Sequence, residues 1–204
     1  MSINLWNSFQ KRNQLSEKEL GQFQKYYELL SEWGQKINLT TIKDLAEVLD
    51  FHFQDSLALG SAMDLKDKSL ADVGTGAGFP GIPLKIKYPD LKLILIEVVG
   101  KKVAFLSEVI KQLELENVQI VQIDWRTFLR SSEIPIQIFT ARASVRILEL
   151  LRIFKPASKY KKNSTLVYWA SEKSFSELKT QPLIEKSYEY EIENQKRFLI
   201  FFKQ

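Results

Sequence analysis

The residues with the clearest chemical potential form a glycine-rich run at positions 70–83 of the 204-residue chain, LADVGTGAGFPGIP. Four of the eight glycines lie between positions 74 and 81. The apolar residues before Gly74 are typical of a buried strand, and Pro83 suits the first turn of a helix. Glycines let a ligand approach the backbone closely, and a helix start offers unpaired N–H groups. The run therefore predicts a strand, a ligand-binding turn and a helix.

A Gly-x-Gly-x-Gly run alone also fits an ordinary tight turn, so its neighbours decide what it binds. The dinucleotide fingerprint places a glycine where this chain has Phe79, and no Gly-Lys-Ser/Thr of a P-loop follows. Glu97 ends the next apolar run, where a carboxylate can accept hydrogen bonds from ribose hydroxyls. With Asp72 before the glycines, this pattern resembles the S-adenosylmethionine pocket of class I methyltransferases.

The second part of the chain alternates strands with helices, which predicts a doubly wound, Rossmann-like α/β sheet. Strands are expected at residues 70–73, 91–97, 118–123, 136–139, 165–169, 188–193 and 198–202, the last two joined as a hairpin across residues 194–196. Helices are expected at residues 83–88, 100–113, 145–154 and 174–179.

Ligands of open α/β sheets bind at the carboxyl ends of the strands. In this chain those ends carry residues 72–78, Glu97, residues 124–126 and Arg142. All of the informative side chains are therefore predicted on one rim of the sheet.

Residues 1–69 predict an N-terminal helical extension, or cap, in front of this domain of residues 70–204, the two forming one compact unit. Ser16 and Glu19 have the spacing of a helix capping box, and an apolar stripe follows as far as Gly34. Further helices are expected at residues 43–52 and 55–60. His52 and Asp55 are three residues apart and could share a helical face, although a lone histidine is more often structural than catalytic.

Composition excludes several classes of protein. The chain has 45% hydrophobic and 26% charged residues, as is ordinary for a soluble globular protein. It has no cysteine and one histidine, which excludes disulfides and thiolate metal sites and argues against a histidine-rich metal centre. With no apolar stretch long enough for a membrane span and no signal-peptide pattern, we expect a cytoplasmic monomer without a metal.

The net charge of +4 is unevenly distributed along the chain. Residues 1–69 hold eight basic and ten acidic side chains, whereas the remainder holds 21 and 15. Between Arg142 and Lys162 there are seven basic residues against the single Glu149. This run fits either a solvated face or an edge that binds a polyanion such as RNA.

A set of motifs in order resembles one known family. The motifs are Asn38-Leu39-Thr40, His52 with Asp55-Ser56, the glycine run continuing through Phe79-Pro80-Gly81-Ile82-Pro83-Leu84, Lys101-Lys102 with Phe105-Leu106, Arg142-Ala143, and Arg197-Phe198-Leu199-Ile200. Over nearly its whole length the chain resembles the bacterial 16S rRNA (guanine(527)-N7)-methyltransferases, also called glucose-inhibited division protein B. The Pro-Gly-Ile-Pro continuation is the specific part, because generic class I methyltransferases lack it.

The resemblance implies S-adenosylmethionine as cofactor, small-subunit ribosomal RNA or its precursor particle as partner, and a set of site residues. Gly74, Phe79, Trp125, Arg126 and Arg142 would contact the cofactor. Together with the residues proposed from their own chemistry, the expected cofactor-binding set is Asp72, Gly74, Gly76, Gly78, Phe79, Glu97, Asp124, Trp125, Arg126 and Arg142.

The chain departs from the family pattern at two places. The family usually has Arg-x-Glu where this chain has Asp124-Trp125-Arg126, and Lys-Gly where this chain has Ala170-Ser171. Asp124 could accept a hydrogen bond from the adenine amine, and Trp125 could cover the adenine ring. Lys173 could replace the missing lysine.

Guanine N7 carries a lone pair and no proton, so methyl transfer to it needs no general base. Arg142 or Arg197 would then contact guanine O6 or a phosphate, or Arg142 would hold the cofactor carboxylate; an ordinary salt bridge is the alternative role for Arg142. Two other functions stay open: a non-catalytic RNA-binding protein with a degenerate methyltransferase fold, and a class I methyltransferase acting on protein or a small molecule.

Overall fold

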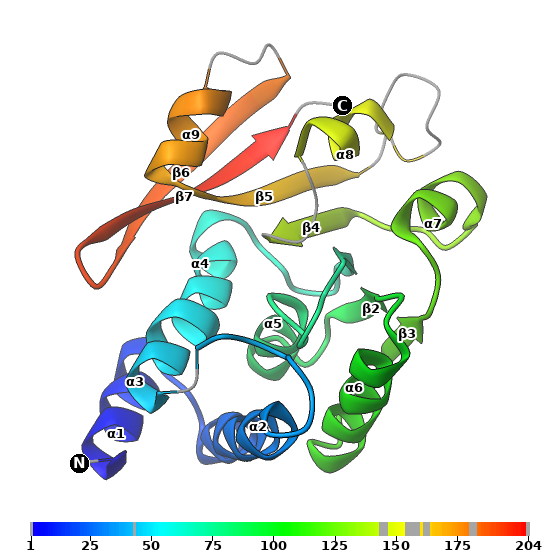
Figure 1. Ribbon diagram of the computed structural model, residues 1–204. Coiled ribbons are helices and arrows are strands. Elements are labelled where there is room, and N and C mark those ends of the chain that lie inside the picture. Colours follow the sequence, from blue (N-terminus) through cyan, green and yellow to red (C-terminus); the bar gives the residue numbers. More distant parts are fainter. Residues whose placement is uncertain are drawn as a thin grey trace.

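The computed structural model describes residues 2–42, 44–142, 147–153, 160, 164–179 and 183–202. Its N-terminal part is helical, as expected, with α1 (Ser2–Asn13), α2 (Glu17–Gly34), α3 (Leu45–Val48), the π-helical segment η1 (Leu49–Gln54) and α4 (Asp55–Ala62) (Figure 1). The predicted capping box is present, because the Ser16 hydroxyl accepts from the Glu19 N–H while the Glu19 carboxylate accepts from the Ser16 N–H. Helix α2 ends at Gly34, also as predicted.

Two features of this part differ from the sequence-based expectation. Helix α1 was not expected, because only Trp6 and Phe9 of its twelve residues are buried and its apolar pattern is weak. Two separate helices were expected at residues 43–52 and 55–60, but α3, η1 and α4 follow one another without a break over residues 45–62. The π-helical segment η1 connects α3 to α4, so that the three segments form one continuous helical stretch.

A seven-stranded sheet forms the centre of the molecule (Figure 1). Its strands are β1 (Ser69–Val73), β2 (Lys92–Ile96), β3 (Val118–Val121), β4 (Ile138–Arg142), β5 (Thr165–Ser171), β6 (Ile184–Ile192) and β7 (Gln195–Phe202). Their spatial order is β3-β2-β1-β4-β5-β7-β6, with β1 to β5 parallel and β7 antiparallel to both β5 and β6. The order reverses between β1 and β4, which is the switch point where open sheets bind ligands.

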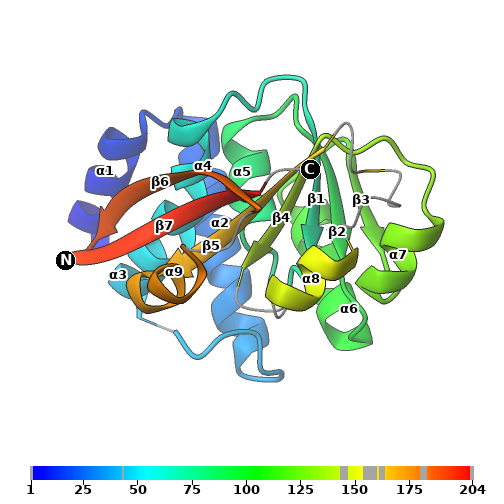
Figure 2. The same cartoon turned by 90° about the horizontal axis from the view of Figure 1, so that it is seen from above.

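Helices cover both faces of the sheet, as the doubly wound prediction requires (Figure 2). Alternate residues of β1 and β2 belong to two different apolar clusters, so that Leu70 and Leu93 face one side while Ala71 and Ile94 face the other. The first face packs against α2, α4, α5 (Gly81–Lys87) and α6 (Gly100–Gln112). The second packs against α7 (Trp125–Ser131), α8 (Ile147–Ile153) and α9 (Glu172–Leu178).

The C-terminal hairpin is confirmed, but its turn lies earlier than predicted. Ile192 pairs with Gln195, so Glu193 and Asn194 are the two turn residues, with φ of 48° and 60°. Positive φ at both positions is the requirement of a type I′ turn, which suits the twist of a hairpin. Glutamate is unusual in that conformation, which is why the sequence pointed to residues 194–196 instead.

At the rim of the sheet, the structure differs from the sequence-based expectation in further respects. Strand β4 runs to Arg142 instead of ending at Phe139, and β3 ends at Val121 instead of Ile123. Residues 124–126, expected to follow the strand as part of the rim, begin the unexpected helix α7. Of the basic run, Arg146, Lys155, Lys159, Lys161 and Lys162 lie outside the described residues, as do Val145 and Phe154 of the expected helix.

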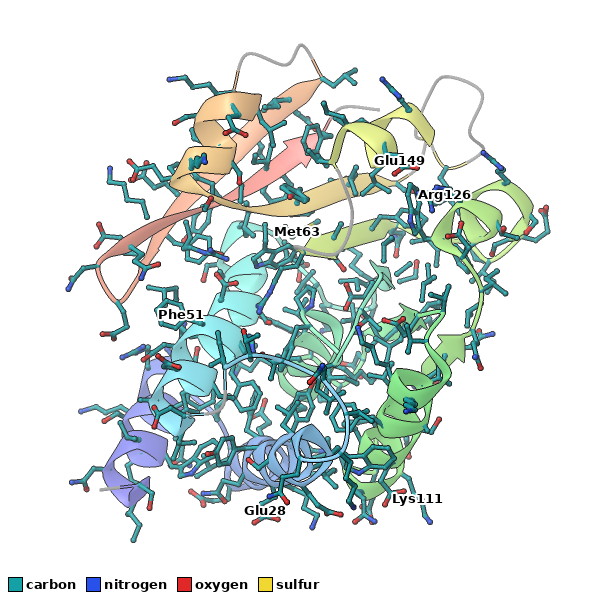
Figure 3. All side chains as sticks on the ribbon, viewed as in Figure 1. Glu28, Phe51, Met63, Lys111, Arg126 and Glu149 are labelled. Carbon is teal, nitrogen blue, oxygen red and sulfur yellow. The ribbon has the colours of Figure 1, made fainter. Side chains whose placement is uncertain are left out.

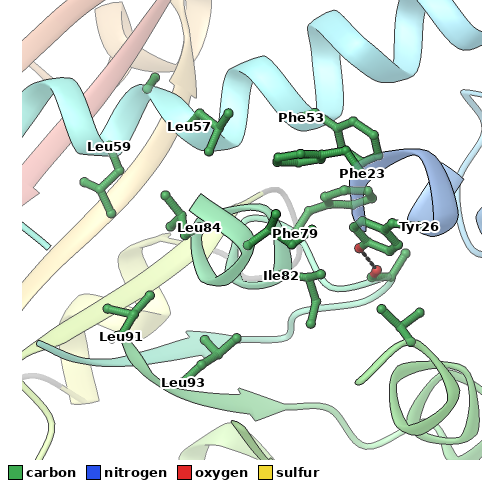
Figure 4. Packing of buried hydrophobic residues seen from close by; sticks show 14 of the residues in the cluster. Phe23, Tyr26, Phe53, Leu57, Leu59, Phe79, Ile82, Leu84, Leu91 and Leu93 are labelled. Carbon is green, nitrogen blue, oxygen red and sulfur yellow. Dashed lines mark hydrogen bonds between the residues drawn. The ribbon is translucent and has the colours of Figure 1, made fainter. Parts of the chain in front are cut away.

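Aromatic residues join the N-terminal helices to the sheet domain (Figure 4). The fully buried rings of Phe23 and Phe53 lie 5.0 Å apart, and Tyr26 lies 5.4 Å from Phe53 and 5.5 Å from Phe79 of the glycine loop. One apolar cluster therefore contains residues from both sides of position 69. The division into residues 1–69 and 70–204 stays a prediction. Across the described residues, every helix is too short or too polar to span a bilayer.

This shared core predicts that the cap and the sheet domain unfold together. Replacing Phe23 with Ala should lower the free energy of unfolding by about 3–5 kcal/mol, because it removes a large buried ring. Ile3→Ala, at an exposed position of α1, is the control and should change it by less than about 0.5 kcal/mol. Urea denaturation followed by circular dichroism measures both, and a Phe23→Ala loss below 1 kcal/mol would contradict the shared core.

Candidate functional site

The glycine loop lies directly after β1 and is tied to the end of β2. The Thr75 N–H donates to the Ile96 carbonyl (3.2 Å), and the Thr75 carbonyl accepts from the N–H groups of Gly78 (2.9 Å) and Phe79 (3.1 Å). These bonds close a compact turn in which Gly74, Gly76 and Gly78 all have positive φ. The sequence prediction of a tight turn at this strand-to-helix junction is confirmed.

Gly76 and Gly78 are needed for different reasons. A Cβ on Gly76, where φ is +62°, would have only the Gly74 carbonyl oxygen near it, at 4.0 Å. A Cβ on Gly78, where φ is +98°, would lie 2.7 Å from both Ile82 Cγ1 and the Tyr26 hydroxyl. Gly78 thus serves internal packing, whereas Gly76 leaves open space where a ligand can reach the backbone.

Asp72 braces the glycine loop from within the protein. Its fully buried carboxylate accepts hydrogen bonds from the Thr75 hydroxyl (2.6 Å), the Thr140 hydroxyl (3.0 Å) and the Gly81 N–H (3.0 Å). Burial raises the pKa of Asp72 to about 6, against the opposing effect of these three donors. In this arrangement Asp72 fixes both ends of the loop, and a direct contact with a cofactor stays a prediction.

Glu97 faces the loop from the end of β2. One of its oxygens accepts from the Gly76 N–H (3.0 Å) and the other from the N–H groups of Val98 and Val99 (2.9 Å each). A carboxylate offers about four acceptor positions, so about one remains for a ligand hydroxyl. The side chains of Val98 and Val99 beside it are 53% and 44% exposed. Glu97 itself is only 6% exposed, and its bond to Gly76 holds the two residues together beside these valines.

Asp124, Trp125 and Arg126 come together on the same rim but bind one another. Asp124 caps α7 by accepting from the Arg126 N–H (2.9 Å), and its other oxygen pairs with the Arg126 guanidinium (3.0 Å). That guanidinium lies 4.6 Å from the centre of the Trp125 ring and also pairs with Glu149 of α8 (Figure 3). Trp125 is largely buried in the second apolar cluster. Their contact with adenine stays a prediction.

A second polar cluster centres on Asp55, the first residue of α4. Its carboxylate is 1% exposed and pairs with Arg142 of β4 (3.0 Å) and with Arg197 of β7 (3.1 Å). The hydroxyl of Tyr190 in β6 donates to the same carboxylate (2.7 Å). The two arginines singled out from the sequence thus converge on one acid.

Arg142 also binds the π-helical segment η1 in the N-terminal cap. Its Nη2 donates to the Phe51 carbonyl (3.0 Å) and to His52 Nδ1 (2.7 Å), and its Nη1 lies within 3.4 Å of the His52 carbonyl and Ser56 hydroxyl oxygens. Both terminal nitrogens of Arg142 therefore have partners on the cap. These contacts support the salt-bridge role for Arg142.

His52 links this cluster to the glycine loop. Its ring stacks on Phe79 with a centre distance of 4.4 Å and an interplanar angle of 24°. Because arginine can only donate, Nδ1 accepts from Arg142 and the ring proton lies on Nε2, which donates to the Thr40 hydroxyl (2.7 Å). Burial and then the charge of Arg142 lower the pKa of His52 to about 4. The ring is neutral at physiological pH.

Sequence reasoning missed Tyr190 and Tyr26 as residues that support the site. The His52 and Asp55 pair was noticed from its spacing, but Tyr190 lies 135 residues from Asp55 and has no local signal. Within the described residues no group of three or more acidic or histidine side chains is placed to hold a metal ion.

The strand order with its antiparallel β7, the glycine turn after β1 and the acid after β2 define a class I S-adenosylmethionine-dependent methyltransferase fold. Among solved structures, the chain is similar to M. capricolum TrmK in complex with S-adenosyl-homocysteine, with a TM-score of 0.54 and 17% identity over 72% of this chain and 67% of that one.

Residues 19–198 match the family model described as rRNA small subunit methyltransferase G, GidB. The chain belongs to this family, which confirms the resemblance found in the sequence. It is 40% identical over 167 residues to ribosomal RNA small subunit methyltransferase G of Staphylococcus saprophyticus, and 50% identical over 105 residues to that of Lachnoclostridium phytofermentans. These matches cover 81% and 51% of this chain, and 69% and 43% of the relatives' own lengths.

The raised pKa of Asp72 predicts a pH-dependent cost of burying its charge. Asp72 holds its proton more tightly when folded, so its contribution to stability is full below pH 3.8 and is lost as the pH rises through about 6. His52 contributes with the opposite sign, fully above pH 6.5 and less as the pH falls toward 4, so the two slopes oppose each other. Asp72→Asn should therefore gain about 2 kcal/mol of unfolding free energy relative to the wild type between pH 4 and pH 7.

Urea denaturation at pH 4, 5, 6 and 7 measures this difference. Asparagine can keep all three contacts, because its carbonyl can accept from Thr75 and Gly81 while its amide donates to Thr140. The control is Asp90→Asn at an exposed position, whose free energy of unfolding should change with pH as that of the wild type does. If the free energy of unfolding of Asp72→Asn also changed with pH as the wild type does, the raised pKa of Asp72 would be contradicted.

Because the chain has a single histidine, nuclear magnetic resonance can measure the pKa of His52, which binds Arg142 in the cluster around Asp55. In the folded protein the imidazole resonances should titrate with a midpoint of about 4, and in urea with a midpoint near 6.5. Above the folded midpoint the ¹⁵N shifts should report the tautomer protonated on Nε2. A folded-state midpoint near 6.5 would show that His52 is solvated and that its bond with Arg142 does not persist in solution.

Proposed function

We propose that the chain is an S-adenosylmethionine-dependent methyltransferase that methylates N7 of a guanosine in a loop of small-subunit ribosomal RNA. The observation that carries this proposal is the open space at Gly76 beside the Glu97 carboxylate, at the switch point of a sheet in a member of the methyltransferase G family. An enzyme of this kind would work in the cytoplasm, and we propose that it acts there as a monomer.

The residues around Gly76 suit S-adenosylmethionine better than a phosphate ligand. The loop has neither the P-loop lysine nor a third fingerprint glycine, and its neighbour Glu97 is an acid that would repel a phosphate. Glu97 retains about one acceptor position for a ribose hydroxyl, and the exposed Val98 and Val99 offer an apolar surface beside it. The amino acid end of the cofactor, which carries no phosphate, would lie against Gly74 and Gly76. Gly78, which packs against Ile82 and Tyr26, would support this part of the loop from inside.

The bound cofactor supplies an activated methyl group, and the protein has to position the acceptor atom. Guanine N7 presents a lone pair without a proton, so no side chain has to remove one. This agrees with a site whose only histidine is buried, neutral and bound on both ring nitrogens. Catalysis would then rest on alignment, which can supply roughly 7–11 kcal/mol of a barrier.

Arg142 and Arg197 remain candidates for contact with guanine O6 or a phosphate, and Arg142 for the cofactor carboxylate. Each is paired with Asp55, so a new partner would have to replace or share an existing bond. The target guanosine should lie in a loop or be splayed out, because the deep groove of an A-form helix hides N7. The exposed Arg152 belongs to the basic run that we propose faces the RNA.

Gly76→Asp should abolish cofactor binding and leave the fold intact. At a φ of +62° an aspartate costs about 1–2 kcal/mol of backbone strain, which is small enough for the chain to stay folded. Its side chain would enter open space, where its charge would add to that of Glu97 and of the cofactor carboxylate. Isothermal titration calorimetry with S-adenosylmethionine should show a loss of at least about 100-fold in affinity. Gly21→Asp, on the exposed face of α2, should bind like the wild type. If Gly76→Asp bound S-adenosylmethionine as tightly as the wild type, this loop would not be the cofactor site.

The product identifies the reaction. Small-subunit rRNA from a strain that lacks the gene, free and within its particle, should accept labelled methyl, and mass spectrometry should locate it on guanine N7. Label on ribose or on another base would point to a different methyltransferase. Cofactor-independent RNA binding without transfer would favour the non-catalytic alternative.

A further inference from the structure

Tyr26 of the N-terminal cap makes a direct hydrogen bond to the glycine loop. It lies in the middle of α2, its side chain is completely buried, and its hydroxyl donates to the Ala77 carbonyl (Figure 4). Ala77 stands between Gly76, which leaves space for a ligand, and Gly78, which packs against the protein. A residue of the cap therefore reaches the backbone at the centre of the proposed cofactor site.

This bond and a second one fix the same peptide group. The carbonyl of the peptide between residues 77 and 78 accepts from Tyr26, and its N–H, which belongs to Gly78, donates to the Thr75 carbonyl (2.9 Å). The neighbouring Gly78 has φ of +98°, in a region where glycine has wide freedom to rotate. With both ends of this peptide bonded, this freedom is removed, and the residue that directly follows Gly76 is held in one orientation.

The surroundings keep the Tyr26 hydroxyl in place as a donor. Its ring packs against Phe53 (5.4 Å) and Phe79 (5.5 Å), so it has no room to turn away. Burial and the nearby charge of Asp72 raise the pKa of Tyr26 well above its usual value, which keeps the proton on the hydroxyl. The Ala77 carbonyl is itself buried, and losing its partner would leave an unsatisfied acceptor that the loop must move to satisfy.

We propose that Tyr26 is a positioning residue for the cofactor, so that the N-terminal cap forms part of the cofactor site through the hydrogen bond from Tyr26 to the Ala77 carbonyl. The proposal rests on the proposed function, because it assigns Tyr26 to the loop that would hold S-adenosylmethionine. Tyr26 acts through the backbone of the loop and not by touching the methyl group.

The test compares Tyr26→Phe with two controls. The phenylalanine keeps the ring packing and removes only the hydroxyl. Phe23→Leu weakens the same core without touching Ala77, and Tyr168→Phe removes a hydroxyl on the opposite face of the sheet. Binding of S-adenosylmethionine is measured by calorimetry, Michaelis constants by methyl transfer to rRNA, and exchange of the Gly78 amide by hydrogen–deuterium exchange.

Tyr26→Phe should bind the cofactor about tenfold more weakly, the size expected for one buried hydrogen bond. Its KM for the cofactor should rise while its KM for RNA stays unchanged, and its Gly78 amide should exchange faster. Both controls should bind like the wild type. Equal binding by Tyr26→Phe and wild type would overturn the proposal, as would the same loss in Phe23→Leu, since general weakening of the core would then explain it. A wild type that fails to bind the cofactor would instead overturn the proposed function.

Discussion

The buried carboxylate of Asp55 joins the N-terminal cap to three strands of the sheet. It receives two guanidinium groups and a phenol, which come from the ends of β4, β7 and β6, while it belongs itself to the N-terminal cap. Two arginines around one acid leave a net positive charge in a nearly dry place, and such a cluster is tolerable only when every donor is satisfied. The cap carbonyls of Phe51 and His52 supply the missing acceptors for Arg142. The position of the cap is thus set by the hydrogen-bonding needs of residues in the sheet.

The glycine loop is supported by groups from several directions. Asp72 holds its two ends from inside the sheet, Glu97 holds Gly76 from β2, and Tyr26 holds the Ala77 carbonyl from α2. The stacked ring of His52 adds a fourth contact through Phe79. The Cβ direction of Gly76 remains open. A loop built of flexible residues is in this way made rigid by its neighbours, as a site that works by alignment requires.

The two departures from the family pattern have a shared local role. Asp124 and Ser171 are both N-cap residues, of α7 and α9, and each accepts a backbone N–H at the start of its helix. Aspartate and serine are among the preferred residues at such positions. The changes therefore fit the local backbone. Lys173 lies in the exposed first turn of α9, where it is free to serve as the replacement suggested by the sequence.

The sequence by itself determined the parts of this protein that depend on local chemistry. Strand and helix alternation, the capping box at Ser16, the turn at Gly74 to Gly78 and the acid at Glu97 were all readable, because spacing along the chain decides each of them. The weakly apolar α1 and the Glu193–Asn194 turn were not, because packing overrides local preference there.

Only the tertiary structure decided which side chains pair. Asp55 meets Arg197 from 142 residues away, and Tyr26 meets Ala77 from 51 residues away. No periodicity encodes such contacts. The first arises where the sheet brings β4, β6 and β7 against the cap, and the second where α2 packs on the loop after β1. The order of strands and helices along the chain therefore indicated a methyltransferase fold but did not show which side chains Arg142 and Arg197 bind.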